Sequence, residues 1–467
     1  METEATAPHA KKRRTEEGPE RRQEPEEIAS HSPPNYQPPR RPHPKPATTE
    51  WEEPRGGEER PLGAGSGEGS EGVDRISGLP DAILGDIISL LSTKDGIRTQ
   101  TLASRWRHLW LSAPLNIDGR SLPADEQFQE FIISRILARH PGPVWRFSLY
   151  AMDTHTYLWD SDAWLRSPAL DNLQELELGV LPQPQLMLTS PPDSVFRFSA
   201  TLRVLNVSRF HLPDAMVETL HFPQLSHLGL EVVKVSDDAL HRIIAGCPVL
   251  EYLLLLGNLY LDHLRLRINS PSLRGIGMSS GKLIIEDAPL LERLLQLQTY
   301  PGMNVSVISA PKLKMLGCFS DSGYCDSKLV FGTTVIQVVT FTTVVYSVKI
   351  LSISIYNHSQ EVVINLMRCF PCLEKLYVQF LYRSSVSRNI YSWRPKHHNL
   401  ITGFDIRLKT VVLKNYQGTK SQVNFGLFFL LNAKMLELLE FKIGHHCDNN
   451  QMFVAEQHRL LQQEKSA

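Results

Sequence analysis

The chain has 467 residues, enough for about three domains or for one long array of repeats. Its 49 lysines and arginines nearly balance its 50 aspartates and glutamates, so it carries no overall positive charge that would favour nucleic acid. Its 6 cysteines are too few for a disulfide scaffold, the N-terminus lacks an apolar leader, and no stretch reaches about 18 apolar residues. We therefore expect an intracellular protein, in the nucleus, the cytoplasm or both, with no nucleic-acid or membrane partner.

Residues 1–72 differ in composition from the rest of the chain. They are rich in Pro, Glu, Arg and Gly and contain almost no large aliphatic side chains. Such a segment cannot bury enough apolar surface to offset the entropy of ordering, so we predict a disordered tail. Within it, Lys11, Lys12, Arg13 and Arg14 resemble a short nuclear-import signal, although a chance basic run in a charged tail is the interpretation we favour.

Residues 74–118 predict three short helices. Pro80 suits the first turn of the first helix, where its missing N–H costs nothing. Thr93 is expected to cap the second helix, with Asp95 favourable in its first turn and Ile97 facing inward. Apolar side chains recur at helical spacing, as Ile83, Leu84, Ile87, Ile88 and Leu91 in the first helix and as Leu102, Trp106, Leu109 and Trp110 in the third.

The stretch SRWRHLW, residues 104–110, interleaves basic and aromatic side chains, which could mark a nucleic-acid surface or a protein contact. Arg105, Arg107 and His108 offer only two or three phosphate contacts, too few for strong binding at physiological salt. The spacing from Trp106 places both indoles on one side of a helix together with Leu109. About forty residues with this much apolar surface need a partner or an adjoining domain to cover them. We therefore predict a helix whose tryptophans anchor a protein contact.

The same segment resembles an F-box of the plant form, which reads D-x-I-S-x-L-P-D, then T-K-D-x-x-R-T, then S-x-R-W-R-x-L-W. The matching residues are Asp74, Ile76, Ser77, Leu79, Pro80 and Asp81, then Thr93, Lys94, Asp95, Arg98 and Thr99, then Ser104, Arg105, Trp106, Arg107, Leu109 and Trp110. Ser92 departs from the pattern, which has proline before T-K-D, and is expected to loosen the turn.

The F-box resemblance implies docking on a Skp-type adaptor and, through it, on the cullin of a ubiquitin ligase. The adaptor-binding residues that it implies are Leu79, Pro80, Ile83, Ile87, Ile97, Leu102, Trp106, Leu109 and Trp110, with Arg105 as a polar contact at the rim. Which of them face the adaptor and which face the core of the three helices is left open by the sequence.

From about residue 170 the frame P-x-L-x-x-L-x-L recurs. Copies begin at Pro223, Pro248, Pro271, Pro289, Pro311 and Pro371, and NLQELEL, TLRVLNV, VKILSI, LKTVVL and MLELLEF fit the frame without the proline. The copies lie mostly about 18 to 29 residues apart, close to the period of leucine-rich repeats. Proline cannot donate to a ladder, so we expect it just before each strand, with alternate leucines such as Leu228 and Leu230 pointing inward.

Helices are predicted to return the chain between some copies. Ser236 and Ser359 are candidate N-caps of two such helices. One strand and one return per unit build a solenoid with a parallel sheet on its concave side. The usual repeat asparagine is convincing only at Asn258, so we expect irregular repeats, some without helices. The predicted fold class is α/β: a three-helix F-box over residues 73–118, then an irregular leucine-rich-repeat solenoid over residues 119–368.

Residues 369–445 resemble the FBD region that follows such repeats in plant F-box proteins. The matching stretches are CFPCLEKLYVQF at 369–380, IRLKTVVLKNYQG at 406–418 and FLLNAKMLELLEFKI at 429–443. The resemblance implies that this region continues the repeats and assigns it no catalytic role. Residues 446–467 are predicted to be a C-terminal tail.

Candidate chemical groups form no recognisable catalytic or metal-binding pattern. Cys369 and Cys372 form an isolated C-x-x-C that we interpret as two cysteines at a helix end, although Cys318 and Cys325 would complete a zinc site by number. His397, His398, His445, His446 and Cys447 lie in predicted loops without ligand spacing. No motif of a nucleophile, zinc protease or phosphate loop is present, so we expect no enzyme activity, cofactor or metal.

The resemblance implies the substrate-recognition subunit of an SCF-type ubiquitin ligase, in which the repeats bind an unknown protein to be ubiquitinated. Two alternatives remain, a scaffold that occupies the adaptor without degrading a partner and a small-molecule sensor built on the repeats. Against the sensor, the positions expected on the concave face show no evident convergent pocket, and they are Ser226, His227, Glu251, Tyr252, Glu374 and Lys375.

Overall fold

The computed structural model divides the chain into the units Met1–Gly72 and Val73–Ala467, and every described residue lies in the second. The described residues are 76, 78–123, 125–151, 162–181, 188–257, 264–297, 303–320, 329–331, 334–336, 344–356, 360–381, 405–444 and 451–463. The predictions for the tail of residues 1–72, including its basic run, therefore lie outside the described residues, as do those for Asn258 and Ser359.

The first elements are the three helices α1 (Asp81–Leu90), α2 (Thr93–Thr99) and α3 (Ser104–Ser112). Pro80 is the cap residue directly before α1. The expectation that Thr93 caps α2 is wrong, because Ser92 is the cap and its hydroxyl accepts a hydrogen bond from the Asp95 N–H at 3.3 Å. Ser92 therefore closes the turn that it was expected to loosen. Leu102, predicted on the third helix, lies in the turn before it.

The Thr93 hydroxyl instead ties α2 to the strand that follows the helices. It donates to the Asn116 carbonyl at 2.8 Å and accepts from the Asp118 N–H at 2.7 Å. Both partners belong to β1 (Leu115–Asp118), the first strand of the main sheet. The three helices are thereby fastened to one end of that sheet.

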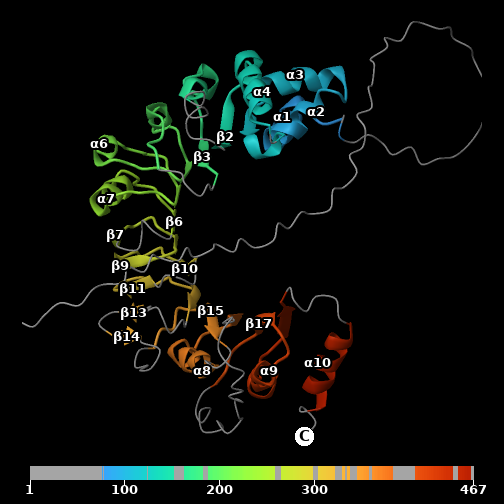
Figure 1. Cartoon of the computed structure of the whole chain (residues 1–467), viewed down its shortest axis with the longest axis vertical. Helices are drawn as coiled ribbons and strands as arrows, with labels where there is room; N and C mark the ends of the chain where they lie inside the picture. The colour runs from blue at the N-terminus through green and yellow to red at the C-terminus, as the bar shows by residue number, and fades with distance from the viewer. Residues whose placement is uncertain are drawn as a thin grey trace, which may run out of the picture. The chain divides into compact units, whose positions relative to one another are not determined.

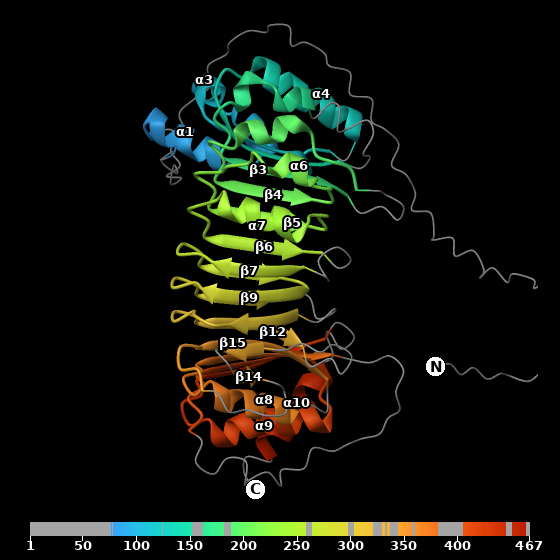
Figure 2. The ribbon, with the colours of Figure 1, turned by 90° about the vertical axis from the view of Figure 1, so that its left-hand side faces the viewer.

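The main sheet contains 13 strands, and each pair of neighbours is parallel. Figure 2 shows its strands stacked in chain order, which the colours follow from green to red. This confirms the predicted parallel sheet, and each of the eleven copies of the frame supplies one strand. After β1 the strands are β2 (Val144–Ala151), β3 (Glu175–Val180), β4 (Val204–Ser208), β5 (His227–Glu231), β6 (Tyr252–Leu256), β8 (Gly275–Met278), β10 (Arg293–Gln296), β12 (Met315–Ser320), β15 (Ile350–Tyr356), β16 (Lys375–Leu381), β17 (Thr410–Tyr416) and β18 (Leu438–Ile443).

The prolines of the frame occupy a turn that precedes each strand by a few residues, not the position directly before it. The Leu250 N–H donates to the Cys247 carbonyl across Pro248, at 3.2 Å, and β6 begins at Tyr252. Leu313 and Ala310 make the same bond across Pro311. Proline suits the second position of such a turn because its φ is already fixed near the value required. Inside the strands the alternate leucines are buried as predicted, among them Leu228 and Leu230.

A second sheet replaces the return helices in the middle of the chain. Its order is β14 (Thr334–Ile336), β13 (Leu329–Phe331), β11 (Met303–Val307), β9 (Gly281–Asp287) and β7 (Arg265–Asn269), parallel apart from the β13–β14 hairpin. From β6 to β12 the chain alternates between the two sheets. Figure 1 shows β7, β9, β11, β13 and β14 on the same side of the main sheet as α6 and α7. The expected repeats without helices are confirmed, and a return strand takes the place of each helix.

Helices return the chain elsewhere: α4 (Glu126–Arg139), α6 (Asp214–Val217), α7 (Asp237–Ala245), α8 (Gln360–Cys369) and α9 (Lys420–Asn432), with short 3-10 helices at Gly119–Ser121, Pro168–Leu170 and Asp193–Phe198. Ser236 caps α7 as predicted, since its hydroxyl accepts from the Ala239 N–H at 3.1 Å. In the predicted C-terminal tail, a further helix, α10 (Gln451–Gln463), is bonded through Gln457 to the Tyr416 hydroxyl at 2.8 Å. That helix was not predicted.

Candidate functional site

The two tryptophans of α3 belong to the core of the protein. Trp106 has 6% of its surface exposed, and Leu109 and Trp110 are equally well buried, next to Leu84 and Ile88 of α1. The Trp110 ring lies 5.0 Å from that of His140. The prediction that both indoles anchor a contact with another protein is therefore corrected, because this chain itself covers them. The short basic and aromatic stretch is a packing helix.

The remaining predicted adaptor residues divide by exposure. Leu79, Ile87 and Ile97 are half-buried against the core, whereas Pro80, Ile83 and Leu102 are exposed. Ile83 is 45% and Leu102 is 65% exposed, unusual values for large aliphatic side chains. The structure thereby separates the side chains that face the core from those that remain exposed, a distinction that the sequence left open.

Leu90 of α1 is 83% exposed and was not among the predicted residues. Ile83, Ile87 and Leu90 follow one another at intervals of four and three residues, so they lie along one side of α1. Leu84 and Ile88 follow a separate line that is buried. Helical spacing counted from Ile83 would have found Leu90, and we call Ile83, Leu90 and Leu102 the exposed apolar set.

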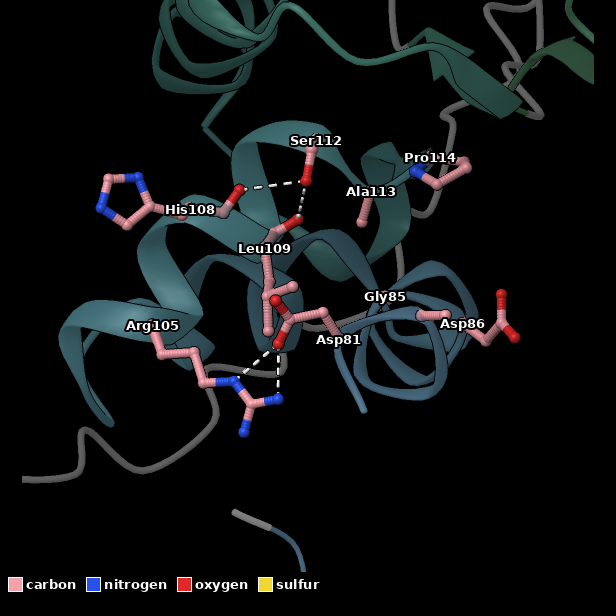
Figure 3. Close-up of a pocket in the computed structure, with 10 residues that line it drawn as sticks. Asp81, Gly85, Asp86, Arg105, His108, Leu109, Ser112, Ala113 and Pro114 are labelled. Atoms are coloured by element: carbon pink, nitrogen blue, oxygen red, sulfur yellow. Dashed lines mark hydrogen bonds and ion pairs between the residues drawn. The ribbon is translucent and has the colours of Figure 1, made fainter. Parts of the chain in front are cut away.

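Arg105 links α3 to the beginning of α1 (Figure 3). Its Nε donates to Asp81 Oδ1 at 2.7 Å, and one terminal nitrogen donates to the Leu79 carbonyl at 2.6 Å. Arg105 was expected at the rim of a partner contact, and its side chain is 40% exposed. These bonds hold Leu79 and Asp81, at the beginning of α1, against α3.

A hollow of about 570 Å³ opens between α1 and α3, and we call it the helix hollow (Figure 3). A Cβ atom added to Gly85 would meet no atom within 4 Å, which shows how open this side of α1 is. Polar and apolar groups line it in nearly equal measure, with two carboxylates and an arginine among them, so it suits a partner surface better than a small apolar ligand. Its lining includes Asp81, Gly85, Asp86, Arg105, His108 and Ser112.

The open face of the main sheet, opposite the core, carries a second hollow of about 320 Å³ that we call the sheet hollow. His227 of β5 and Tyr252 of β6 line it with their rings stacked, 4.7 Å apart. Both positions were expected on this face, but no convergent pocket was expected there. That expectation is wrong, because the pocket depends on glycines of the neighbouring strand β8 that the frame treats as variable positions.

Glu177 of β3 is the centre of a polar cluster on the same face. Its carboxylate accepts hydrogen bonds from Arg120 at 2.6 Å, Arg146 at 3.0 Å and the Ser148 hydroxyl at 2.8 Å. The Arg120 guanidinium also lies 4.7 Å from the centre of the Tyr150 ring. With its charge matched by two arginines, this carboxylate is bound in a network that stabilises the sheet.

The described part of the chain holds no group of three or more His, Cys, Asp and Glu side chains that could bind a metal ion. Cys369 ends α8, as interpreted from the sequence, and burial raises the pKa of its thiol to about 11. Burial raises the pKa of Cys247 to about 12. The side chain of Cys318 and the predicted candidates Cys325, His397, His398, His445, His446 and Cys447 lie outside the described residues. Among the described helices, none is both long and apolar enough to cross a membrane.

Comparison with protein families matches two parts of the chain. The family model described as "FBD-associated F-box protein At5g56370, LRR repeats" matches residues 161–378, from before β3 into β16. The FBD family model matches residues 398–441, which include β17, α9 and most of β18. The two models together cover the main sheet from β3 almost to its last strand.

Curated proteins of Arabidopsis thaliana are similar to the chain. The putative F-box/FBD/LRR-repeat protein At5g44950 is 32% identical over 231 residues, which cover 47% of this chain and 52% of that protein. The F-box protein At1g60400 is 31% identical, over 38% of this chain and 45% of its own length. The F-box/FBD/LRR-repeat protein At1g51370 is 26% identical, over 51% of this chain and 53% of its own length. The chain thus spans about half the length of the curated relatives that it matches.

The matched family models and these relatives agree with the strand-by-strand repeat seen in the structure. The chain belongs to the family of plant F-box proteins that combine leucine-rich repeats with an FBD region.

Proposed function

We propose that this protein is the substrate-recognition subunit of an SCF-type ubiquitin ligase. In this proposal α1, α2 and α3 form the F-box and dock on a Skp-type adaptor, which links the chain to a cullin. The observation that carries the proposal is the exposed apolar set, Ile83 and Leu90 on α1 and Leu102 in the turn before α3, in a group of helices whose tryptophans are already buried. The F-box names of the relatives support the same assignment.

The exposed apolar set provides the energy for docking. Covering a large aliphatic side chain completely contributes about 1.5–3 kcal/mol. Three such side chains supply enough to offset part of the entropy lost on association. The helix hollow lies on the other side of α1, between that helix and α3, and its charged residues Asp81, Asp86 and Arg105 would set the orientation of the adaptor.

The main sheet supplies the surface that binds the protein to be ubiquitinated. In this role the chain itself need perform no bond chemistry and needs no cofactor. It raises the effective concentration of substrate lysines near a carrier enzyme that other subunits bind. Such a role places the protein inside the cell, in the nucleus, the cytoplasm or both.

The test is a calorimetric titration of the full chain with a purified Skp-type adaptor. Leu102→Asp and Ile83→Asp alter exposed side chains, so the fold is retained, unlike in variants of the buried Trp106. We expect each variant to weaken adaptor binding at least tenfold. Leu431→Asp is the matched control, because Leu431 is a 62% exposed leucine on α9, and it should bind like the parent.

Two results would contradict the proposal. A folded parent chain that does not bind the adaptor removes the F-box assignment. Binding by Leu102→Asp and Ile83→Asp that is as tight as that of the Leu431→Asp control removes the exposed apolar set as the docking surface. Circular dichroism of each variant verifies that it is folded.

A further inference from the structure

The sheet hollow extends across five neighbouring strands of the open face, β4, β5, β6, β8 and β10. Glycines stand at outward positions beneath it, and side chains of neighbouring residues lean over them: Asn206 over Gly229, Tyr252 over Gly275, and Leu254 and Leu297 over Gly277. In register, Gly277 lies between Leu254 of β6 and Leu295 of β10. Leu254 is 39% exposed at this place. The hollow is therefore an apolar depression in a surface that otherwise carries polar side chains.

Tyr252 forms a rigid wall of the sheet hollow. Its ring lies so close to Gly275 that a Cβ atom there would be 2.7 Å from the ring carbon Cδ1. The His227 ring stacks on its other side, and the Ser226 hydroxyl holds His227 Nδ1 at 2.8 Å. Neither aromatic ring has to be ordered when a ligand binds, so little conformational entropy is lost there.

The charge of the lining points to an acidic ligand. Arg293 of β10 is the one charged side chain among the lining residues, and the lining contains no carboxylate. The neighbouring Arg274 faces Glu251 at 3.7 Å and Glu292 at 3.9 Å, whereas the Arg293 guanidinium has no ion pair in the described part of the chain. Arginine with an open donor fork is the residue best suited to bind a carboxylate.

The width of the hollow favours an extended peptide over a small molecule. Neighbouring strands are about 4.8 Å apart, so five strands span about 19 Å, the length of about six extended residues. A small-molecule site encloses most of its ligand, whereas this depression lies open on the face of a sheet. Its volume of about 320 Å³ has room for one or two side chains of a segment that crosses it.

We propose that the sheet hollow binds an extended segment of the substrate protein that presents one bulky apolar side chain beside a carboxylate. The apolar side chain packs on the exposed part of Leu254, beside Leu295 and the Tyr252 ring, and the carboxylate pairs with Arg293. This proposal rests on the proposed function, because it names the feature by which the ligase recognises its substrate.

The test uses four fluorescein-labelled decapeptides in a Gly-Ser background that differ only in their central triplet: Asp-Phe-Asp, Asn-Phe-Asn, Asp-Gly-Asp and Lys-Phe-Lys. Fluorescence anisotropy measures their binding to the full chain. We expect the Asp-Phe-Asp peptide to bind at least tenfold more tightly than each of the others. Equal binding of all four peptides, or binding of none, overturns the proposal.

Variants locate the site. Arg293→Glu should lose the preference for Asp-Phe-Asp and bind Lys-Phe-Lys better, and Leu254→Asn should weaken Asp-Phe-Asp at least tenfold. Lys282→Glu makes the same charge reversal at an exposed position of β9 and should behave like the parent. The proposal is overturned if neither Arg293→Glu nor Leu254→Asn weakens the binding of the Asp-Phe-Asp peptide. Direct binding of 3-phenylpropionate in a calorimetric titration, lost in Arg293→Glu, also overturns the proposal when no peptide binds, because the occupant is then a small molecule.

The adaptor titration on the same preparations separates this inference from the proposed function. Arg293→Glu lies in β10 and should bind the adaptor like the parent chain. Adaptor binding without selective peptide binding removes the substrate motif and leaves the receptor function intact. Selective peptide binding without adaptor binding rules out the receptor function. The sheet hollow then remains a peptide-binding site whose role is unconnected with a ubiquitin ligase.

Discussion

Arg105 Nε on α3 donates a hydrogen bond of 2.7 Å to Asp81 Oδ1 at the first residue of α1. The pair joins residues 24 positions apart and fixes the angle at which the chain enters α1. Both side chains are substantially exposed, at 40% and 67%. The bond therefore organises the helices more than it stabilises them, because water screens an exposed ion pair.

A double-mutant cycle measures the energy of this pair. We expect a coupling energy between Arg105→Ala and Asp81→Ala of about 0.2–1 kcal/mol in urea denaturation, and a smaller value in about 1 M salt. Arg105→Ala alone should cost more than Asp81→Ala, because it also removes the bond to the Leu79 carbonyl. A coupling energy several times larger would show that the pair is shielded from solvent, contrary to the structure.

Ser92 is the N-cap of α2, and its replacement should reveal the energy of that cap. Ser92→Ala removes the acceptor for the Asp95 N–H and should destabilise the protein by about 1 kcal/mol. Ser92→Pro should cost less, because Ser92 has a φ of -62°, which proline adopts without strain, and proline lowers the entropy of the unfolded chain. Urea midpoints of the two variants check this order, and a Ser92→Ala variant as stable as the parent contradicts the assigned cap.

His140 makes stability depend on pH. Burial lowers the pKa of its imidazole below the usual value of 6.5, and the hydrogen bond to the Ala113 carbonyl opposes this effect only in part. The unfolded chain therefore takes up the proton more readily than the folded one. The contribution of neutral His140 is complete above about pH 6.5 and is lost as the pH falls below that value.

Comparison with a His140→Gln variant isolates this contribution. Between pH 7.5 and about pH 5 the parent should lose more stability than the variant, because the other titrating groups are common to both. The free energies of unfolding in urea at several pH values provide the measurement. Parallel curves for parent and variant would show that His140 is accessible to solvent in the folded protein.

The two cysteines of the C-x-x-C should differ in reactivity. Cys369 is buried with a pKa raised to about 11, so very little thiolate forms at neutral pH, whereas Cys372 is half-buried in the following turn. We expect iodoacetamide to label Cys372 at least tenfold faster than Cys369 in the folded chain. Mass spectrometry of tryptic peptides measures both rates, and equal rapid labelling would contradict the burial of Cys369.

The main sheet was predictable because its pattern is local. Each strand of the frame places two leucines, such as Leu253 and Leu255, two positions apart, and their burial requires the same register in every repeat. The second sheet shows a similar alternation, in Leu266 and Ile268 of β7. The second sheet was missed because its strands do not carry the proline and leucine frame. A short apolar alternation alone does not show whether the segment between two frame copies is a strand or a helix.

The candidate site was harder to predict because the exposure of its side chains depends on how the helices pack against one another. In α1 both Ile83 and Leu84 are apolar, and only the packing of α3 against the helix decides that Leu84 is buried and Ile83 is exposed. The tryptophans of α3 were assigned to a contact for the same reason. The sheet hollow depends on Gly277 standing beside Leu254 and Leu295 on neighbouring strands, and such neighbours are defined by register across repeats.

Hydrogen exchange of the full chain with and without a Skp-type adaptor tests the central claim most directly, because it shows where the partner binds. The account predicts slower amide exchange in α1 and α3, around Ile83 and Leu102, and no change in β18 at the far end of the main sheet. Unchanged exchange throughout the chain, or protection confined to the sheet while α1 and α3 exchange as before, would contradict it.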